Sequence, residues 1–565
     1  MIPRSVRRFV DRPRRSFRFR NTVRAMAAFS LIFACTGQTA PTSEVDTEPD
    51  ATTSQSTNPQ SSEERPSLVI SLDTDVTTLE PHTFRSTGSF AVTGALYDEL
   101  LRERLEQGDD GIWVGTRQFE GNLAESWSIS DDGLEATFLL RDGIKFASGE
   151  PITAEDFQWS LTKAIDGPGF VDAQLPFIGL TESSTIEAPD NRTLMLRPLH
   201  SSPLLEQFMS YQNYTVMDRS AVEEQASSND PWGVEWLSRH PTPSGPYTLV
   251  EYDPDSQVVL APNPEYWDPD FPRNGGLTIR FVPDGEQRAL LVQRGELDFA
   301  NGIPSRMLEV LSADPNVQVY RTPSTALYFL GMNVQTPPFD DVNVRQAISY
   351  AAPYDALVEE VLHGFGNTAG GFVSRNMDTY AGDEIGTYET DLERAQELLS
   401  EAGVEALSLE LAVLQSKAED QEAAVFIQDN LRQIGIDVEI LVLPDGEFFT
   451  RLNNGELPFF LHYWYQWGED PFVFMTFLVK TGSFTNYTRF SNARLDEIIE
   501  EATLEPDEGR RAELSREAQE ILLEEAPMAY LYNRDWAAVA RPEVSGINRD
   551  LTEIPRLEWL SKEAG

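Results

Sequence analysis

The chain has 565 residues, more than one hydrophobic core usually accommodates, so we expect a folded part of two or three lobes. Its 44 Lys and Arg against 92 Asp and Glu give a net charge of −48 at pH 7, and a field of that sign repels the phosphates of nucleic acids. Composition and charge therefore argue against a nucleic-acid partner.

Residues 1–35 have the layout of an export signal. A basic region is followed by an apolar run from Ala25 to Ala34, which is too short to span a bilayer comfortably. The segment from Ile32 to Cys35 is similar to a bacterial lipoprotein cleavage box, in which the cysteine becomes the lipidated first residue. The alternative is an ordinary signal peptide with an incidental cysteine, and Sec and twin-arginine export both stay open.

Residues 36–65 consist mostly of Ser, Thr, Pro, Gln, Asn and acidic residues, with Val45 as the one large aliphatic side chain. Such a segment buries too little apolar surface to offset its ordering entropy, which predicts a disordered linker. Because Cys35 is the only cysteine, disulfides and cysteine-based zinc sites are excluded. We expect no cofactor and no metal.

The first ordered element is a short apolar strand at Leu68–Leu72. The sequence Asp131-Asp132-Gly133 is typical of a turn between strands. Further along, Thr153 and Asp156 form the pattern of a capping box ahead of apolar residues at helical spacing.

A clearer unit lies between residues 390 and 443. Thr390 and Glu393 predict a capping box, and a helix should then run to Gly403. Period-two alternation predicts strands at 407–413 and 436–442, with an apolar-faced helix between them. Strand, helix and strand with short joints predict a βαβ crossover with parallel strands.

Many short motifs occur in a characteristic order along the chain. They include Leu79-Glu80-Pro81-His82, Leu123-Ala124-Glu125-Ser126-Trp127, Gly149 to Phe157, Pro243 to Tyr247, Asn263 to Trp267, Gly295 to Asp298, Pro338-Phe339-Asp340, Val344 to Ile348 and Leu398 to Gly403. Each motif alone is weak, but together they span residues 68–530. In that order they resemble the family 5 extracellular solute-binding proteins, the dipeptide- and oligopeptide-binding group.

The resemblance implies an α/β fold of the type II periplasmic-binding-protein kind, with two lobes joined by hinge strands and an extra subdomain in lobe 1. It implies a ligand buried when the lobes close. We assign the lobes as follows: 66–92, 218–332 and 530–565 to lobe 1, 93–217 to the extra subdomain, and 333–529 to lobe 2. Most motif residues should be scaffold: we expect Tyr266 and Trp267 to pack in the core or between lobes, and Arg345 to form a structural ion pair.

Four aromatic residues lie within the five positions from Tyr463 to Trp467. The stretch resembles a family segment that typically reads Trp-x-x-Asp, whose Asp often pairs with a peptide's α-ammonium group. Trp464 takes the Trp position, but Trp467 replaces the Asp. A buried ammonium without a partner costs several kcal/mol. Either Glu469 or Asp470 would therefore have to supply the negative charge, or an indole face would have to supply a cation–π contact.

Two alternatives remain at this point. In the first, the ligand carries no ammonium group and is instead a molecule such as a sugar, whose ring stacked Trp and Tyr side chains favour. In the second, the aromatic residues belong to the core of a strand. We predict ligand contacts in lobe 2 from Trp464, Tyr465, Gln466, Trp467, Glu469, Asp470 and Asn486. The other wall should come from the loop 81–88, with Ser86 and with Arg85, which could bind a carboxylate in bidentate fashion or lie exposed at the surface.

Enzyme motifs are largely absent from the sequence. There is no Gly-Lys pair, no Gly-x-Ser-x-Gly and no His-Glu-x-x-His, and we expect a binding protein rather than an enzyme. A secreted hydrolase is the alternative of a different class, because carboxylates are plentiful. The resemblance implies a monomer in the periplasm or at the cell surface, held by a lipid anchor, that captures peptides, oligosaccharides or another small solute for an ABC permease and its ATPase.

Overall fold

The computed structural model describes residues 65–83, 86–169, 171–254, 256–377, 379–465 and 470–563. The predicted export signal, Cys35 and the linker up to residue 64 lie outside the described residues. Within the described ranges, no helix combines the length and the apolar character needed to cross a membrane.

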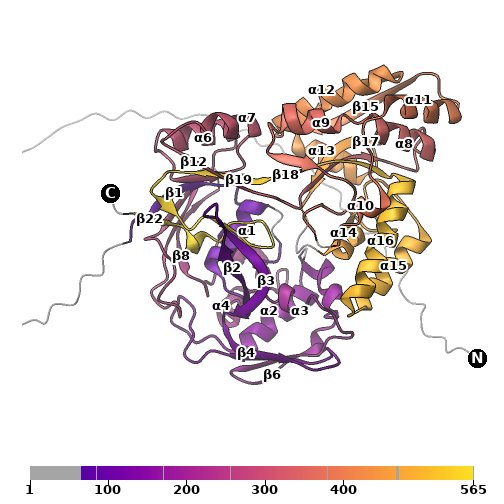
Figure 1. Cartoon of the computed structure of the whole chain (residues 1–565). Helices are drawn as coiled ribbons and strands as arrows, with labels where there is room; N and C mark the ends of the chain where they lie inside the picture. Colours follow the sequence, from indigo (N-terminus) through magenta and orange to yellow (C-terminus); the bar gives the residue numbers. More distant parts are fainter. Residues whose placement is uncertain are drawn as a thin grey trace, which may run out of the picture. The chain divides into compact units, whose positions relative to one another are not determined.

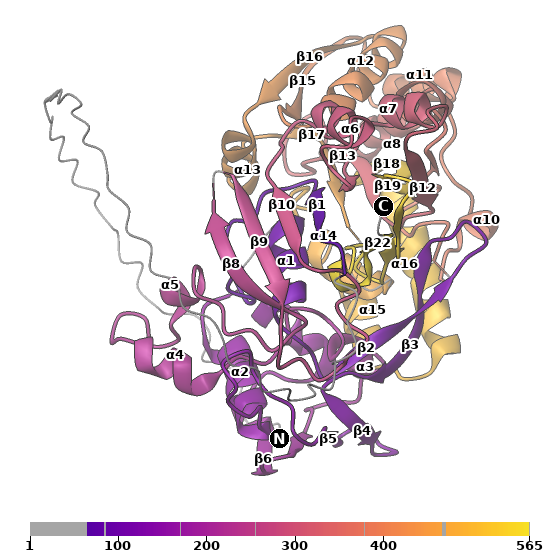
Figure 2. The same cartoon turned by 90° about the vertical axis from the view of Figure 1, so that its left-hand side faces the viewer.

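Lobe 1 is built on a seven-stranded mixed sheet (Figure 1, Figure 2). The predicted strand at 68–72 is confirmed as β1 (Leu68–Ser71), which pairs in parallel with two neighbours, β10 and β11. The sheet order is β12 (Gln318–Thr322), β19 (Trp536–Ala540), β11 (Phe299–Asn301), β1, β10 (Leu277–Arg280), β9 (Gln257–Pro262) and β8 (Tyr247–Asp253).

Helices cover both faces of this sheet. Alternate residues of β1 serve different cores: Ile70 packs in the cluster that contains α1 (Thr87–Leu96), and Val69 packs against the cluster of α6 (Gly285–Gln293) and α7 (Ser305–Leu311). A strand buried on both faces needs apolar residues in succession, which explains the run Leu-Val-Ile in β1.

Lobe 2 is built on a six-stranded sheet. Its order is β14 (Gly366–Thr368), β18 (Met528–Arg534), β13 (Leu327–Met332), β17 (Phe459–Trp464), β15 (Leu407–Leu414) and β16 (Ile436–Leu443). The predicted crossover is confirmed: β15 and β16 pair in parallel, and α12 (Ala418–Gln433) connects them along the outer edge of the lobe (Figure 2).

The chain crosses between the two large sheets at two adjacent places. Residues 323–326 connect β12 to β13, and Asp535 alone separates β18 from β19. Because β13 and β18 pair within the lobe 2 sheet, we propose these two segments as the hinge, a few residues from the boundaries at 332 and 530 that we assigned from the sequence.

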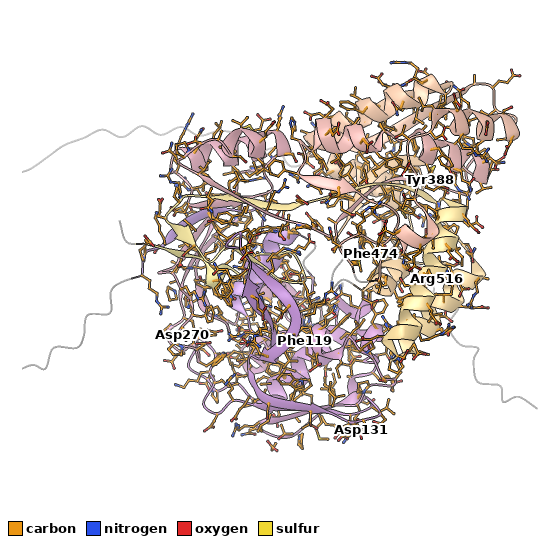
Figure 3. The ribbon with its side chains drawn as sticks, in the orientation of Figure 1. Phe119, Asp131, Asp270, Tyr388, Phe474 and Arg516 are labelled. Atoms are coloured by element: carbon orange, nitrogen blue, oxygen red, sulfur yellow. The ribbon has the colours of Figure 1, made fainter. Side chains whose placement is uncertain are left out.

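The segment from 93 to 217 holds a four-stranded antiparallel sheet and its own core. The strands are β4 (Ala124–Ile129), β5 (Ala136–Leu140), β7 (Thr193–Leu196) and β6 (Ile186–Asp190). The predicted turn joins β4 to β5, with Gly133 at φ 69° and Asp131 at the periphery of this sheet (Figure 3). The predicted capping box of α2 (Ala154–Asp166) is confirmed, since Asp156 accepts the Thr153 N–H at 2.9 Å.

The residues that the family resemblance marked as scaffold have structural contacts. The Trp267 indole donates to Asp98 at 3.3 Å and lies under the Arg141 guanidinium, 4.1 Å from the ring centroid. Arg345, in α8 (Val342–Ala351), pairs with Glu525 at 3.4 Å and donates to the Phe339 carbonyl at 2.9 Å.

One capping prediction is wrong by a residue. The N-cap of α11 (Leu392–Glu401) is Asp391, whose carboxylate accepts the Arg394 N–H at 2.9 Å, while the Thr390 hydroxyl donates to the Ala352 carbonyl. Asp is the stronger N-cap of the two, and the Thr390 hydroxyl is engaged by its tertiary contact with Ala352. Gly403 ends the helix at φ 72°, as predicted.

The other long helices of lobe 2 are α13 (Asp445–Asn453), α14 (Pro471–Leu478), α15 (Ala493–Leu504) and α16 (Glu508–Glu525). Phe474 of α14 is buried, whereas Arg516 of α16 lies at the outer surface (Figure 3). The structure also contains the strands β2 (Leu101–Gln107), β3 (Trp113–Gly121), β20 (Val544–Ser545), β21 (Asn548–Arg549) and β22 (Ser561–Lys562). Its short helices are α3 (Leu205–Phe208), α4 (Arg219–Gln225), α5 (Val234–Leu237), α9 (Tyr354–Ala356) and α10 (Gly382–Ile385).

Candidate functional site

A cavity of about 850 Å³ lies where the two large sheets meet. Its lining residues come from the end of β1 and the start of α1 in lobe 1, from both crossings, and from the segments 414–420 and 463–465 of lobe 2. The volume falls within the range of roughly 300–1,000 Å³ that is common for small-molecule sites. A ligand there would touch both lobes and the hinge at once.

The lobe 1 wall is a preorganised polar loop. Thr87 donates from its hydroxyl to the Asp73 carboxylate at 2.7 Å and lies 2.8 Å from the Thr74 hydroxyl. Ser86 lines the cavity, as predicted, but its side chain also caps α1: it accepts the Ser89 N–H at 3.2 Å and donates to the Asp75 carbonyl at 2.9 Å. These bonds hold the wall rigid without a ligand.

Glycine is required in this loop. A Cβ at Gly88 would lie 2.2 Å from the Thr74 carbonyl oxygen, so only glycine lets α1 approach the end of β1 this closely.

Arg288 lines the cavity but has a structural role. Its guanidinium donates to the backbone carbonyls of Val282 at 2.7 Å, Pro283 at 3.1 Å and Asn301 at 3.1 Å. Burial lowers the pKa of Arg288 below its ordinary value, and the carboxylate of Asp73 opposes that effect. With its donors engaged by the loop between β10 and α6, this side chain shapes the wall rather than binding an anion.

Tyrosines form the lobe 2 wall. Tyr463 stacks on Tyr328 with ring centroids 5.2 Å apart and meets Tyr465 edge-on at 5.4 Å. Strand β17 explains why these residues line the cavity and Trp464 does not, because successive side chains of a strand point to opposite faces. Trp464 instead stacks on Phe477, at 6.2 Å, and packs among apolar residues of lobe 2 and the extra subdomain.

A charged segment follows the carboxyl end of β15. The half-buried Lys417 ammonium lies 4.9 Å from the centroid of the Tyr463 ring, and its interaction with Tyr463 is the main reason that its pKa is raised. Asp420, in the first turn of α12, is 1% exposed, and burial raises its pKa to about 7.

Glu419, between these two charged residues, connects the lobes. It accepts the Ser305 N–H of α7 at 2.6 Å and pairs with Arg534 at 3.2 Å, at the end of β18. Arg534 in turn donates to the Ile303 carbonyl of lobe 1 at 2.7 Å. The lobes are therefore joined by polar contacts on the hinge side of the cavity.

Two other predicted contact residues, Asp470 and Asn486, do not line the cavity. Asp470 caps α14 by accepting the N–H groups of Phe472 at 2.9 Å and Val473 at 3.1 Å, and it also pairs with Arg511. Asn486 is 2% exposed and fixes its own loop through the Lys480 and Phe490 carbonyls. Both side chains are engaged in structural contacts.

The remaining predicted contacts, Arg85, Gln466, Trp467 and Glu469, lie outside the described residues. The segments that carry them are flanked by cavity-lining residues, Ser86 on one side and Tyr465 on the other.

Several lining residues escaped the sequence analysis. Asp73, Lys417 and Asp420 follow the carboxyl ends of β1 and β15, and ligands of α/β sheets bind at that edge. Their position after a predicted strand was therefore a usable signal. Tyr328 carried no such signal, because it lies within a strand whose burial is continuous.

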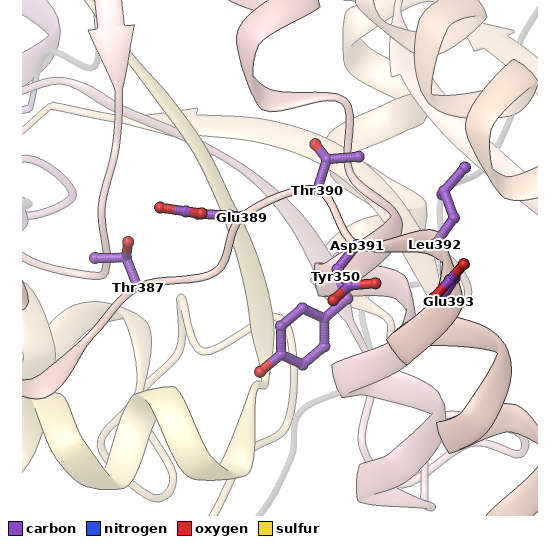
Figure 4. Close-up of a pocket in the computed structure, with 7 residues that line it drawn as sticks. All are labelled: Tyr350, Thr387, Glu389, Thr390, Asp391, Leu392 and Glu393. Carbon is purple, nitrogen blue, oxygen red and sulfur yellow. The ribbon is translucent and has the colours of Figure 1, made fainter.

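A second pocket, of about 430 Å³, is lined by Tyr350, Thr387 and residues 389–393, beside the start of α11 (Figure 4). All its lining residues belong to lobe 2. It cannot enclose a solute between lobes, and we assign it no ligand.

Comparison with known proteins gives a consistent result. Residues 118–486 match the profile of the bacterial extracellular solute-binding proteins, family 5. The chain is 26% identical over 503 residues to a probable D,D-dipeptide-binding periplasmic protein of Escherichia coli K12, covering 88% of this chain and 94% of that protein. It is also 26% identical to a glutathione-binding protein of Shigella boydii, covering 88% of this chain and 93% of that protein.

Solved structures share the fold. The periplasmic binding protein DppA of Helicobacter pylori, in complex with the peptide STSA, superposes with a TM-score of 0.77 at 24% identity, covering 89% of this chain and 99% of that one. A dipeptide-binding protein of Pseudoalteromonas with bound Met-Leu gives a TM-score of 0.77 at 20% identity, covering 88% and 100%. The predicted two-lobed α/β fold is confirmed.

Proposed function

Because the chain belongs to the family 5 bacterial extracellular solute-binding proteins, we propose that it captures a peptide or peptide-like solute in the cavity between its lobes. It is the solute-binding component of an ABC importer, it works outside the cytoplasm, and it is a binding protein rather than an enzyme. The observation that carries the proposed ligand site is a single cavity walled by both lobes and by the two crossings.

The chemistry of the cavity suits a small polar solute with apolar side groups. Lys417 offers a positive charge to a carboxylate, and the rings of Tyr328, Tyr463 and Tyr465 offer flat apolar surface. The relatives' names mention D,D-dipeptides and glutathione, and both are peptides or peptide-like. This similarity supports the peptide class without fixing length or sequence.

The mechanism that we propose is closure about the hinge. A ligand that contacts Thr87 on one wall and Tyr463 on the other binds the closed arrangement better than the open one and shifts the population toward it. The closed form is then the species that docks on the permease.

Calorimetry of the purified protein with glutathione, Met-Leu, the STSA peptide and a β-linked oligosaccharide tests this proposal. We expect saturable binding of at least one peptide and a smaller radius of gyration in solution scattering at saturation. Binding of the oligosaccharide alone would replace the peptide class with a sugar class. Binding of a peptide without compaction would remove the closure step.

We further propose that Cys35 carries a lipid that tethers the folded lobes to the membrane through the residues that follow it. Exchange of Cys35 for serine should release the protein into the soluble fraction. Retention in the membrane fraction would rule out this anchor.

A further inference from the structure

Asp420 is a buried carboxylate whose place in the cavity has no structural explanation. It lines the cavity, it is 1% exposed, and its Oδ2 atom has no hydrogen-bond partner among the described residues. A buried charged oxygen without a partner is costly, and native proteins retain such groups chiefly where function needs them.

Three other carboxylates that line the cavity have hydrogen-bond partners. Asp73 accepts the Thr87 hydroxyl, and Glu419 accepts the Ser305 N–H and pairs with Arg534. Glu553 accepts the Ser324 hydroxyl at 2.6 Å and the Thr325 N–H at 2.8 Å. Among the described carboxylates that line the cavity, Asp420 is the one with a buried side-chain oxygen that lacks a hydrogen-bond partner.

The neighbouring cations do not donate a hydrogen bond to the Oδ2 atom of Asp420. Lys417 and Arg534 are close enough to favour the charged form of Asp420, and Glu419 opposes it, but none of these groups supplies a hydrogen bond to Oδ2. Arg534 is held by Glu419 and the Ile303 carbonyl, and Lys417 lies against the Tyr463 ring. Within the part of the chain that the structure describes, Oδ2 is left without a hydrogen bond that a ligand could supply.

In the segment that the sequence suggested for amine binding, the carboxylate of Asp470 already has structural partners. Trp467 stands where the family segment has its amine-binding Asp, and the carboxylate of Asp470 caps α14 and pairs with Arg511. Asp470 is therefore not available to an ammonium group in the cavity, and Asp420 is a lining carboxylate that can take this role.

We propose that Asp420 binds the ammonium group of the solute, so that this protein selects ligands with a free primary amine, anchored at the first turn of α12 instead of the segment 464–470. The proposal rests on the proposed function and specifies its ligand class.

The test compares a peptide with its N-acetylated form, in which a neutral and bulkier amide replaces the ammonium group. The probe is whichever of glutathione, Met-Leu and STSA binds wild-type protein most tightly by calorimetry. N-acetylation should weaken binding to the wild type by roughly 10- to 100-fold, the effect of one hydrogen bond to a charged group. D420N should weaken binding of the free peptide by a similar factor and should no longer distinguish the two forms.

The matched control is Asp429→Asn, on the exposed face of the same helix, where Asp429 pairs with Arg432. It should leave affinity for both forms unchanged. D420N should also raise the melting temperature of the ligand-free protein, because it removes an unpaired buried charge. That rise shows that the variant is folded.

The outcomes separate the two proposals. If D420N retains wild-type affinity, or still discriminates against the N-acetylated form as strongly as the wild type, then the amine anchor is wrong while peptide capture stands. If wild-type protein binds none of the three peptides, the proposed function fails and this inference fails with it.

Discussion

Lys163 and Glu80 form an ion pair with both side chains fully buried, between α2 of the extra subdomain and the loop after β1. His82 completes the cluster: its backbone N–H donates to Glu80 at 3.1 Å, and its Nδ1 lies 3.3 Å from the Lys163 ammonium. Burial, followed by the charge of Lys163, lowers the pKa of His82 well below its ordinary value, so the ring stays neutral and can accept. The carboxylate of Glu80 and the ammonium of Lys163 thus satisfy each other in an apolar environment, while the Nε2 atom of His82 is buried without a hydrogen-bond partner among the described residues.

Lys163→Met should destabilise the protein by about 3–5 kcal/mol, because it leaves the Glu80 carboxylate buried without its cation. Lys145→Met is the matched control: Lys145 pairs with Glu265 at 2.8 Å, but the side chains are 46% and 38% exposed, and such pairs contribute about 1 kcal/mol or less. Urea denaturation of both variants measures the difference. Equal denaturation midpoints would show that the buried ion pair contributes no more to stability than the exposed ion pair does.

At the scale of elements, the crossing at residues 323–326 is held by a C-terminal loop. Glu553 clamps residues 324–325 through the Ser324 hydroxyl and the Thr325 N–H, and it also pairs with Arg549 at 3.5 Å. Glu553 has φ 60°, in the left-handed region that non-glycine residues rarely adopt. The surrounding contacts impose this conformation, which is typical of functional segments such as hinges.

Glu553→Ala should loosen the hinge. The variant leaves the buried Thr325 N–H without an acceptor, at a cost of about 1–3 kcal/mol, and amide exchange across 324–326 should accelerate. Glu543→Ala, which removes an ion pair with Arg541 in a neighbouring C-terminal segment, is the control and should leave exchange at the hinge unchanged. Unaltered exchange in the Glu553 variant would mean that the loop does not control the crossings.

Elements also show which parts of the fold follow from local sequence. The crossover of β15, α12 and β16 was predictable because each element carries its own periodicity, and the short joints leave one arrangement. The position of Tyr463 on the cavity face and of Trp464 on the core face was not predictable. A strand pattern gives two faces, and only the neighbouring elements decide which face meets the cavity.

At the scale of the whole molecule, burial of carboxylates couples stability to pH. Burial raises the pKa of Glu103 to about 7, with the charge of Asp550 adding to the effect, and raises the pKa of Asp420 to about 7. A carboxyl group with a raised pKa in the folded state binds more protons there than in the unfolded chain. Its contribution to stability is therefore largest at low pH and is lost as pH rises through the ordinary value toward 7.

We expect the ligand-free protein to melt at a higher temperature at pH 5.5 than at pH 7.5, with each such group contributing up to about 1.4 kcal/mol per pH unit. Glu103→Gln should flatten this slope, because glutamine does not titrate and still offers one acceptor to the N–H groups of Arg117 and Leu551. Thermal melts of both proteins across this range provide the measurement. If the melting temperature of Glu103→Gln falls with pH as steeply as that of the wild type, Glu103 does not contribute to the pH dependence of stability.

The sequence by itself determined the family, the α/β class, the crossover and the two-lobed fold, because periodicity, turn chemistry and ordered motifs are local properties. Only the tertiary structure decided which charged residues line the cavity. Asp470 is neutralised by Arg511, forty-one residues away, and Asp420 is left unpartnered because Arg534 turns to Glu419 and to lobe 1. A carboxylate's role depends on the cations that distant segments bring to it, and sequence spacing carries no record of that balance.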